Sequence, residues 1–263
     1  MYQPAHGKFE VSDPAALLAE LATTAPATLV TADADGFETS VLPMIFDPTV
    51  GDDGVLLGHL ARPNPQWVAA ADAHLGADAP LGADAHLGGD GTGHAETRPA
   101  ETRPAETDTR GRAIAIFHGP DAYVSPAWYE EKARTGRVVP TWNYVVVVAY
   151  GTLIVHDDPD WLRAHVRALV DRHEAMRPEP WSVDDAPPAF IDGQVRGIVG
   201  LELVIERIEA KRKLSQNRSA VDVARVIAAL DEGTAMEQAV AQAMRPPADP
   251  TVRPPEASSP RPG

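Results

Sequence analysis

Residues that could hold a phosphorylated ligand gather in the segment Gly58-His-Leu-Ala-Arg-Pro-Asn-Pro-Gln-Trp67. A predicted strand ends near Leu60, and Asn64-Pro65 then supplies an N-cap and the first residue of a helix. Free backbone N–H groups at a helix N-terminus, with the guanidinium of Arg62 beside them, make an arrangement that binds phosphate. Taken alone, the same residues also describe a capped helix with a surface arginine, which is the commoner case.

Aromatic residues gather between prolines in a second candidate segment, residues 120–144. They are Tyr123, Trp128, Tyr129, Trp142 and Tyr144. Because aromatic residues make up only 6% of the chain, this grouping could line a flat, stacked ligand such as an isoalloxazine ring. The alternative is a core corner between two strands, and periodicity alone favours the corner.

The main concentration of positive charge lies between Glu206 and Arg218. Its basic residues are Arg207, Lys211, Arg212, Lys213 and Arg218, set against Glu206 and Glu209. Such a cluster could bind a phosphate, the carboxylates of a partner, or nucleic acid. A solvated turn between a strand and a helix is an equally good interpretation, because Ser215 could cap a helix that begins near Ala220.

Composition narrows the class of protein. The chain has 263 residues, 44% of them hydrophobic, and contains no apolar run long enough to span a bilayer. It has no cysteine, and its N-terminus does not read as a signal peptide, so we expect a cytoplasmic protein. A formal charge of −15 disfavours nucleic-acid binding except through a local basic patch. No nucleophile elbow, Walker loop or zinc-protease motif is present, so catalytic residues are not identified and no metal site is predicted.

Two segments are predicted to be disordered. Residues 71–109 contain three copies of a six-residue unit such as Ala-Asp-Ala-His-Leu-Gly, and carry eight acidic residues against two arginines. Short polar repeats cannot offset the entropy lost on ordering, so this insertion should be a surface loop. Its histidines, at 74, 86 and 94, are expected to be solvated rather than metal-bound. Residues 245–263 form a tail with seven prolines, which disfavours helix and sheet alike.

The remaining pattern predicts consecutive antiparallel strands with peripheral helices. Strands are predicted over residues 27–31, 39–46, 54–60, 113–117, 145–155 and 195–208. Helices are predicted after Asp13-Pro14 and Asn64-Pro65 and over residues 160–176, 220–230 and 235–244. Asp35-Gly36, between the first two strands, is a hairpin signal. We therefore expect an α+β, mainly β fold that forms a closed or partly closed barrel.

Five motifs, in this order, resemble the PaiB family, also called the FMN-binding negative transcriptional regulators. The motifs are Met1-Tyr-x-Pro4, His59-Leu-Ala-Arg-x-Asn-Pro-Gln-Trp67, Phe117-His-Gly-Pro-Asp-Ala-Tyr-Val-Ser-Pro126 with Trp128-Tyr129, Val139-Pro-Thr-Trp-Asn-Tyr144 and Lys213-Leu-Ser-Gln-Asn-Arg218. The match runs from Met1 to about Leu230 and is interrupted by the repetitive insertion, which could shield or crowd the site. Val41 departs from the family pattern, in which a polar residue, often His, is expected.

The resemblance implies an antiparallel Greek-key split β-barrel with peripheral helices, usually a homodimer that holds FMN in the cleft between its subunits. The cofactor-binding residues that it implies are Thr39, Ser40, Arg62, Asn64, Gln66, Trp67, Thr141, Trp142, Asn143, Lys213, Ser215 and Gln216. Those at 39, 40, 62 and 64 would contact the phosphate. Those at 141–143 would border the flavin ring, and those at 213–216 would close the site.

The implied domain organisation is one FMN-binding barrel, residues 1–70 and 110–210, with a helical pair, residues 211–244, packed on it. The implied function is negative regulation of transcription, with DNA as a candidate partner. Against direct binding, the turn and second helix of the pair carry no Arg or Lys before Arg245, which is unlike a recognition helix.

Two alternatives stay open. One is a flavin-dependent oxidoreductase or FMN reductase that acts on a small molecule, in which the flavin itself carries the redox chemistry. The other is a dimeric barrel without flavin that binds a different phosphate-bearing ligand or serves as a protein-interaction module.

Overall fold

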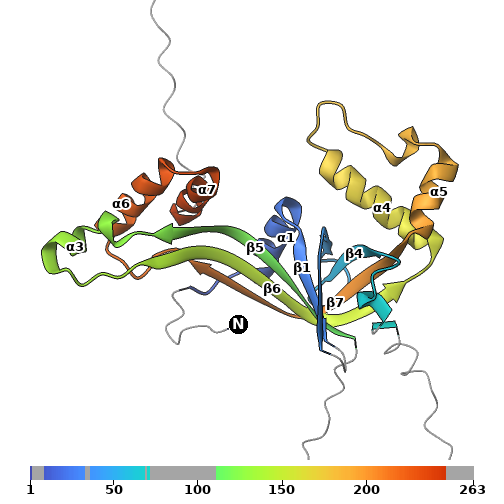
Figure 1. Ribbon diagram of the computed structural model, residues 1–263, viewed down its shortest axis with the longest axis horizontal. Coiled ribbons are helices and arrows are strands. Elements are labelled where there is room, and N and C mark those ends of the chain that lie inside the picture. The colour runs from blue at the N-terminus through green and yellow to red at the C-terminus, as the bar shows by residue number, and fades with distance from the viewer. Residues whose placement is uncertain (2–8, 33–35, 69, 72–110, 247–263) are drawn as a thin grey trace, which may run out of the picture. The chain divides into compact units, whose positions relative to one another are not determined.

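The computed structural model describes residues 1, 9–32, 36–68, 70–71 and 111–246 (Figure 1). The predicted disordered insertion, 71–109, lies outside the described residues except for Ala71. The predicted disordered tail, 245–263, also lies outside them except for its first two residues. No helix in the described ranges is long and apolar enough to cross a membrane.

The described strands form a seven-stranded sheet in the order β2-β1-β5-β6-β7-β4-β3. Their bounds are β1 Ala27–Ala32, β2 Phe37–Leu42, β3 Ile45–Asp47, β4 Val55–Ala61, β5 Arg112–Val124, β6 Thr141–His156 and β7 Ile198–Lys213. β1 pairs antiparallel with β2 and β5, and β4 pairs antiparallel with β3 and β7. Together with the helices, this antiparallel sheet confirms the predicted α+β class.

The first hairpin forms where the sequence predicts it, with Ala27 opposite Leu42 and Thr31 opposite Glu38. Residues of β1 alternate between buried and partly buried, as expected for a strand that presents one face to a core. The single strand predicted over residues 39–46 is wrong, because β2 ends at Leu42 and β3 begins at Ile45. Pro43 lies in this break, and a proline has no N–H to continue a ladder.

The strands β5, β6 and β7 are longer than the sequence patterns predict. β5 runs through Gly119-Pro120 to Val124, although turn-forming residues suggested that it ends at Phe117. The last strand was predicted to begin at Val195, but Val195 is the buried residue of the helix α5, Pro188–Arg196. A short apolar run does not distinguish a strand from a buried helix face, and Gly197 separates the two elements.

The helices begin at residues that cap them. Asp13, Asp158, Ser219 and Thr234 each accept a backbone N–H in the first turn of the helix that follows. These helices are α1 Pro14–Thr24, α4 Pro159–Glu174, α6 Ala220–Asp231 and α7 Ala235–Met244. The pattern did not predict α3, Glu130–Thr135, or α5. The 3-10 helices are η1 Pro126–Trp128 and η2 Val183–Asp185.

The chain divides into two compact units, and β5, β6 and β7 contribute residues to both. The larger unit consists of residues 13–118 and 147–209, and its buried core includes Leu29, Phe117 and Leu201. The smaller unit consists of residues 1–12, 119–146 and 210–263, and includes the helical pair α6–α7 with its buried Leu230 and Val240. The helical pair thus shares a unit with the aromatic segment, a grouping that the predicted domain bounds did not contain.

Candidate functional site

The residues predicted to bind a cofactor separate into two groups, one in each unit. Residues of the first group belong to the larger unit: Thr39, Ser40, Arg62, Asn64, Gln66 and Trp67. Residues of the second group belong to the smaller unit: Thr141, Trp142, Asn143, Lys213, Ser215 and Gln216. Hydrogen bonds join Ser40, Asn64 and Gln66, and Arg62 with Trp67, in the first group. In the second group they join Lys213 with Thr141 and Trp142, and Ser215 with Asn143.

In the larger unit, the first group borders an open groove of about 440 Å³. The groove is lined by Ser40, Val41, Leu42, Pro43, His59, Leu60, Ala61, Asn64 and Ile198. The Nδ2 of Asn64 donates to the Oγ of Ser40 at 2.9 Å. Because the oxygen of Ser40 accepts this bond, its hydroxyl proton is left to donate to a ligand, such as a phosphate oxygen. This predicted pair is therefore brought together on the surface of the groove.

Asn64 also performs its predicted capping role, because its Oδ1 accepts the N–H of Gln66 at 2.9 Å. Gln66 begins the helix that follows and is only 1% exposed. Its Nε2 donates to the backbone oxygens of Leu29 and Glu38, at 3.3 and 3.2 Å. The Gln66 side chain thus ties the helix to the β1–β2 hairpin, and its contribution to the groove is to position Asn64.

Arg62 is engaged by the protein itself. Its guanidinium pairs with both carboxylate oxygens of Asp157, at 3.1 and 2.5 Å, and donates to the backbone oxygens of Arg196 and Ile198. Hydrogen bonding to Arg62 lowers the pKa of Asp157. Of five guanidinium N–H groups, four are used in these bonds. The backbone oxygen of Arg62 also accepts the indole N–H of Trp67 at 3.0 Å, which holds the turn between β4 and the helix.

The outer strand β2 presents exposed apolar side chains, one of which, Val41, stands where the family pattern expects a polar residue. Phe37 and Val41 are 80% and 70% exposed, and alternation places them on the same face of β2 as Thr39. Thr39 itself is exposed and lies opposite Val30 in the β1–β2 ladder. Val41 therefore gives the groove an apolar edge instead of a further hydrogen-bond donor.

His59 lines the groove and contacts a second, buried histidine, His165. Its Nδ1 lies 3.1 Å from the Nε2 of His165 on α4, and burial lowers the pKa of His59. His59 lies in one of the family motifs but was not predicted as a site residue, and His165 lies within the helix predicted over residues 160–176. No pattern along the chain could join them, because the two residues are 106 positions apart.

In the smaller unit, Lys213 is the centre of the second group. Its Nζ donates to the Oγ1 of Thr141 at 2.5 Å and to the backbone oxygen of Trp142. The ammonium also lies 5.6 Å from the centre of the Tyr144 ring, within the range of a cation–π contact. Burial lowers the pKa of Lys213, and the neighbouring charge of Lys211 lowers it further. The Thr141 hydroxyl accepts from Lys213, which leaves its own proton to donate.

Ser215 and Asn143 form the buried part of this group. Ser215 has a positive φ of 63°, and its Oγ donates to the Oδ1 of Asn143 at 3.0 Å. The Nδ2 of Asn143 contacts the sulfur of Met244 in α7 at 3.3 Å. Gln216 closes its own turn, accepting the N–H of Leu214 at 2.7 Å and donating to the backbone oxygen of Arg212 at 2.5 Å. These residues fix the turn that follows Lys213.

The aromatic segment has a buried part, as the core interpretation predicts, and an exposed part. Tyr129 is 2% exposed and belongs to the core, where the guanidinium of Arg218 lies 4.4 Å from its ring centre. Trp142 and Tyr123 are 53% and 45% exposed, and their rings meet edge to face at 6.1 Å. This exposed pair leaves the indole of Trp142 accessible to a flat ligand.

The basic cluster does not form a continuous charged surface. Arg207, in the larger unit, lies 3.8 Å from the Tyr150 ring centre and pairs with Glu209. In the smaller unit, Lys211 is only 7% exposed, and its ammonium lies 5.8 Å from the Tyr144 ring centre. Most of the cluster's charge is thus placed on aromatic rings or carboxylates.

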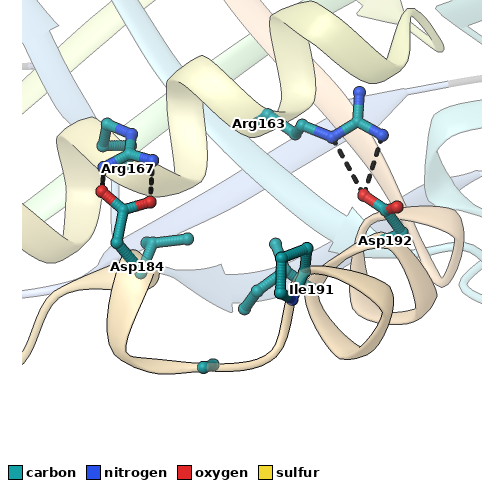
Figure 2. A pocket seen from close by; sticks show the side chains of 8 residues that line it. Arg163, Arg167, Asp184, Ile191 and Asp192 are labelled. Atoms are coloured by element: carbon teal, nitrogen blue, oxygen red, sulfur yellow. Dashed lines mark hydrogen bonds and ion pairs between the residues drawn. The ribbon is translucent and has the colours of Figure 1, made fainter.

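A different cavity, of about 190 Å³, lies between α4 and α5 in the larger unit (Figure 2). Figure 2 shows Arg163 and Arg167 extending from α4 toward Asp192 and Asp184, with which they form ion pairs of 2.9 and 2.6 Å. None of the predicted site residues lines this cavity. Since both arginines are paired, the cavity offers little uncompensated charge to a ligand.

Comparisons with known proteins match the chain to one family model and to several relatives. A family model described as "Putative FMN-binding domain" matches residues 1–207. An uncharacterized protein of Aspergillus fumigatus is 30% identical over 234 residues, which cover 79% of this chain and 82% of that protein. Protease synthase and sporulation protein PAI 2 of Bacillus subtilis is 35% identical over 114 residues, which cover 43% of this chain and 52% of that protein.

Solved structures with a similar arrangement are more distant. A FAD and heme binding protein from Mycobacterium smegmatis gives a TM-score of 0.46 at 15% identity, over 82% of this chain and 78% of that chain. A conserved hypothetical protein from Mycobacterium tuberculosis gives a TM-score of 0.43 at 14% identity, over 82% of this chain and 92% of that chain. At these values neither structure supports an inference about ligand or activity.

Proposed function

Because the chain belongs to the FMN-binding domain family, as its motifs predicted, we propose that it binds FMN, and each of the two groups described above is by itself a candidate for part of the contacts. The observation that carries the proposal is the Ser40–Asn64 pair at the groove, with a hydroxyl proton still to be donated. Lys213 and Thr141 supply a second set of donors, and the exposed indole of Trp142 supplies a stacking surface. These are the chemical requirements of a phosphate, ribityl hydroxyls and a planar ring.

The residues present fit the cofactor, with one adjustment to the predicted roles. Arg62 balances Asp157 in this structure, so most of the positive charge for the phosphate must come from elsewhere. We assign Ser40 and Asn64 to hydrogen bonding in the larger unit. Lys213 is the candidate charged contact of the smaller unit. Bound FMN would supply electron or hydride transfer, and the protein would supply binding and orientation.

The proposal is tested by titrating FMN into the purified protein and following the visible spectrum and flavin fluorescence. Removing a hydrogen bond to a charged group costs about 1.5–3 kcal/mol, so Lys213→Gln should weaken FMN binding by roughly 10- to 100-fold. Lys132→Gln, which removes an exposed lysine of α3, is the matched control and should bind as the wild type does. A wild-type protein that takes up no FMN would contradict the proposal.

The phosphate contact has a separate test. Ser40→Ala should weaken FMN more than riboflavin, because riboflavin lacks the phosphate that the Ser40 hydroxyl is proposed to meet. Equal losses for both ligands would place Ser40 at another part of the cofactor. Ser40→Ala removes only the acceptor of the Asn64 Nδ2. The variant therefore keeps the cap in which the Asn64 Oδ1 accepts the backbone N–H of Gln66.

For the role of the bound flavin, the described residues favour the oxidoreductase alternative over direct DNA binding. The formal charge is −15, and the basic cluster is largely placed on rings and carboxylates. Anaerobic mixing of the FMN-loaded protein with NADH or NADPH should bleach the flavin absorbance. Unchanged absorbance with both donors would contradict nicotinamide-linked activity.

Negative regulation of transcription, the role implied by the family resemblance, is the second candidate. Direct action would require operator binding. A gel-shift titration at low salt against the promoter region next to the coding sequence tests this, with a scrambled duplex of equal length as control. Preference for the promoter would favour regulation, and equal weak retention of both duplexes would count against it.

A further inference from the structure

A second hollow in the larger unit lies between α4 and the strands β3 and β4, and nothing in the proposed function uses it. Its volume is about 360 Å³, within the range of about 300–1,000 Å³ that small-molecule sites occupy. It is lined by Ile45, Phe46, Asp47, Pro48, Leu57, Trp161, Ala164, His165 and Ala168. One face of α4 contributes two alanines, four positions apart, and their small side chains leave the hollow open.

His165 is the buried polar group of this pocket. It is 4% exposed, and its Nε2 lies 3.1 Å from the Nδ1 of His59. Its Nδ1 is also buried and has no hydrogen-bond partner among the described residues. A buried nitrogen without a partner is unfavourable, and a ligand that supplies the missing hydrogen bond gains binding energy from it.

Trp161 forms a rigid wall of the same pocket. Its indole is stacked between the rings of His156 and His165, with centroid distances of 4.2 and 5.3 Å and interplanar angles of 7° and 19°. The indole can lie against β7 because Gly200 has no side chain there, since a Cβ at that position would be 2.2 Å from the Cζ3 of Trp161. The wall is therefore held by three neighbours before any ligand binds.

Charge at the pocket selects against anions. Burial lowers the pKa of His165 to about 4, so its imidazole is neutral near pH 7. Hydrogen bonds from Thr49 lower the pKa of Asp47, which keeps a carboxylate beside the pocket. A neutral imidazole offers either a donor or an acceptor at Nδ1, depending on which histidine of the pair holds the shared proton. A hydroxyl group can satisfy both cases.

We propose that this pocket binds a small neutral molecule with an apolar, ring-sized body and one hydroxyl group, which pairs with the Nδ1 of His165. The body would contact Trp161, Phe46 and Leu57. The pocket and the groove share no lining residue, and the His59–His165 contact joins them. The inference does not depend on FMN, because all of its contacts belong to the pocket and α4.

The test uses three ligands that share an aromatic ring. Phenol has a hydroxyl group, toluene has none, and benzoate carries a negative charge. Each is titrated into the wild-type protein and followed by saturation-transfer NMR and by the side-chain ¹⁵N resonances of histidine. We expect phenol to bind at least tenfold more tightly than toluene and to shift the Nδ1 resonance of His165, and we expect benzoate not to bind. If the wild-type protein binds no phenol, the proposal is wrong. This holds also if another segment of the chain or a second copy of the protein fills the pocket.

Two variants locate the binding. His165→Phe should reduce the affinity for phenol to that for toluene, whereas His173→Phe, at an exposed histidine of the same helix, should change neither. Ala168→Leu should block both ligands by filling the pocket while keeping a good helix former, so it serves even if His165→Phe fails to fold. Phenol binding that survives Ala168→Leu unchanged would overturn the proposal, because the molecule would then be bound elsewhere.

Discussion

At the residue scale, the absence of one side chain decides how three rings are arranged. Gly200 lies in β7, where Trp161 covers it, and Trp161 in turn stacks on His156 and His165. Gly200 is required here by close packing, since no other residue lacks a Cβ. The two histidines have different partners, because His156 pairs with Glu202 at 2.8 Å while His165 faces the ring of His59.

Gly200→Ala is expected to lower the free energy of unfolding by about 1–3 kcal/mol, because the added methyl group would overlap the Trp161 ring. Urea unfolding followed by circular dichroism measures the loss. Gly193→Ala in α5 is the matched control, since the nearest atom to its Cβ would be 3.9 Å away. This control should be neutral or stabilising by up to about 1 kcal/mol. Equal effects of the two substitutions would contradict the close packing of Trp161 on β7.

The buried His165 predicts a pH dependence of stability. Its pKa is lowered from 6.5 to about 4 in the folded state, by burial and then by the charge of His59. Between these values the unfolded chain binds a proton that the folded chain does not, so stability falls as the pH is lowered from 6.5 toward 4. The slope contributed by one such group is at most about 1.4 kcal/mol per pH unit.

Urea unfolding of the wild type and of His165→Phe across pH 4–7 isolates this contribution. Carboxylates titrate in both proteins, so the difference between the two curves reports His165. The wild type should lose stability more steeply than the variant below pH 6.5 and run parallel to it above. Parallel curves throughout the range would show that His165 titrates normally in the folded protein.

At the element scale, one carboxylate organises the helices of the smaller unit. Asp222, in the first turn of α6, is 4% exposed. Its Oδ1 accepts the backbone N–H groups of Glu130 and Glu131, at 2.8 and 3.5 Å, which begin α3. Tyr129, the N-cap residue of α3, makes no such bond with its own side chain. A residue from a distant helix therefore supplies the cap that the local sequence lacks.

Asp222→Ala is expected to destabilise the protein by about 1–3 kcal/mol, because two N–H groups at the start of α3 lose their acceptor. Amide hydrogen exchange at Glu130 should accelerate relative to the wild type. Asp222→Asn keeps an oxygen acceptor and should show a smaller loss and a slower exchange than the alanine variant. If both variants exchange alike, the contact between α6 and α3 does not cap the helix.

At the scale of the whole molecule, the exposed face of β2 bears on assembly. Phe37 and Val41 are 80% and 70% exposed on an edge strand, and contiguous exposed apolar surface is typical of protein–protein interfaces. Val41 also lines the groove, so a subunit packed on this face would lie beside Ser40 and Asn64. The homodimer stays a prediction, in which the partner on this face would adjoin the proposed cofactor site.

Val41→Lys is therefore expected to weaken self-association and FMN binding together. Sedimentation velocity over a range of protein concentrations should show that the variant needs a concentration at least tenfold higher than the wild type to remain dimeric. Val50→Lys, at a 44% exposed position in the turn after β3, is the control and should leave both properties unchanged. A Val41→Lys protein that dimerises normally would place the interface on another surface.

Much of this architecture follows from local sequence. Asp13 caps α1 as predicted, and α4, α6 and α7 begin within one residue of their predicted starts, because a cap and its acceptor lie within three residues. The cap of α6 is Ser219, whereas Ser215 was predicted, and Ser215 instead forms the preceding turn with a positive φ. The alternation of β1 and the hairpin into β2 are local in the same sense. The strand ends are predicted less well, since Gly119-Pro120 reads as a turn but continues β5, and tertiary pairing overrides that preference.

The sequence by itself determined the family, through motifs whose order and spacing survive the long insertion. It also determined that Asn64 caps a helix and that Lys213 and Thr141 belong to one candidate site. Only the tertiary structure decided how each side chain is used. Arg62 meets Asp157 across 95 positions, and His59 meets His165 across 106. Such partners are chosen by how the strands and helices pack, and spacing along the chain contains no record of that choice.

The segment His59–Trp67 shows the difference most clearly. Its sequence predicted the end of a strand, a helix N-cap and a phosphate-binding arginine. The structure supports the first two, directs Arg62 mostly toward Asp157, buries Gln66 under the β1–β2 hairpin and places His59 against His165, which lines a second pocket. Hydrogen-bonding capacity is a property of the residue type, but which partner uses it is settled by the groups that folding brings within about 3 Å.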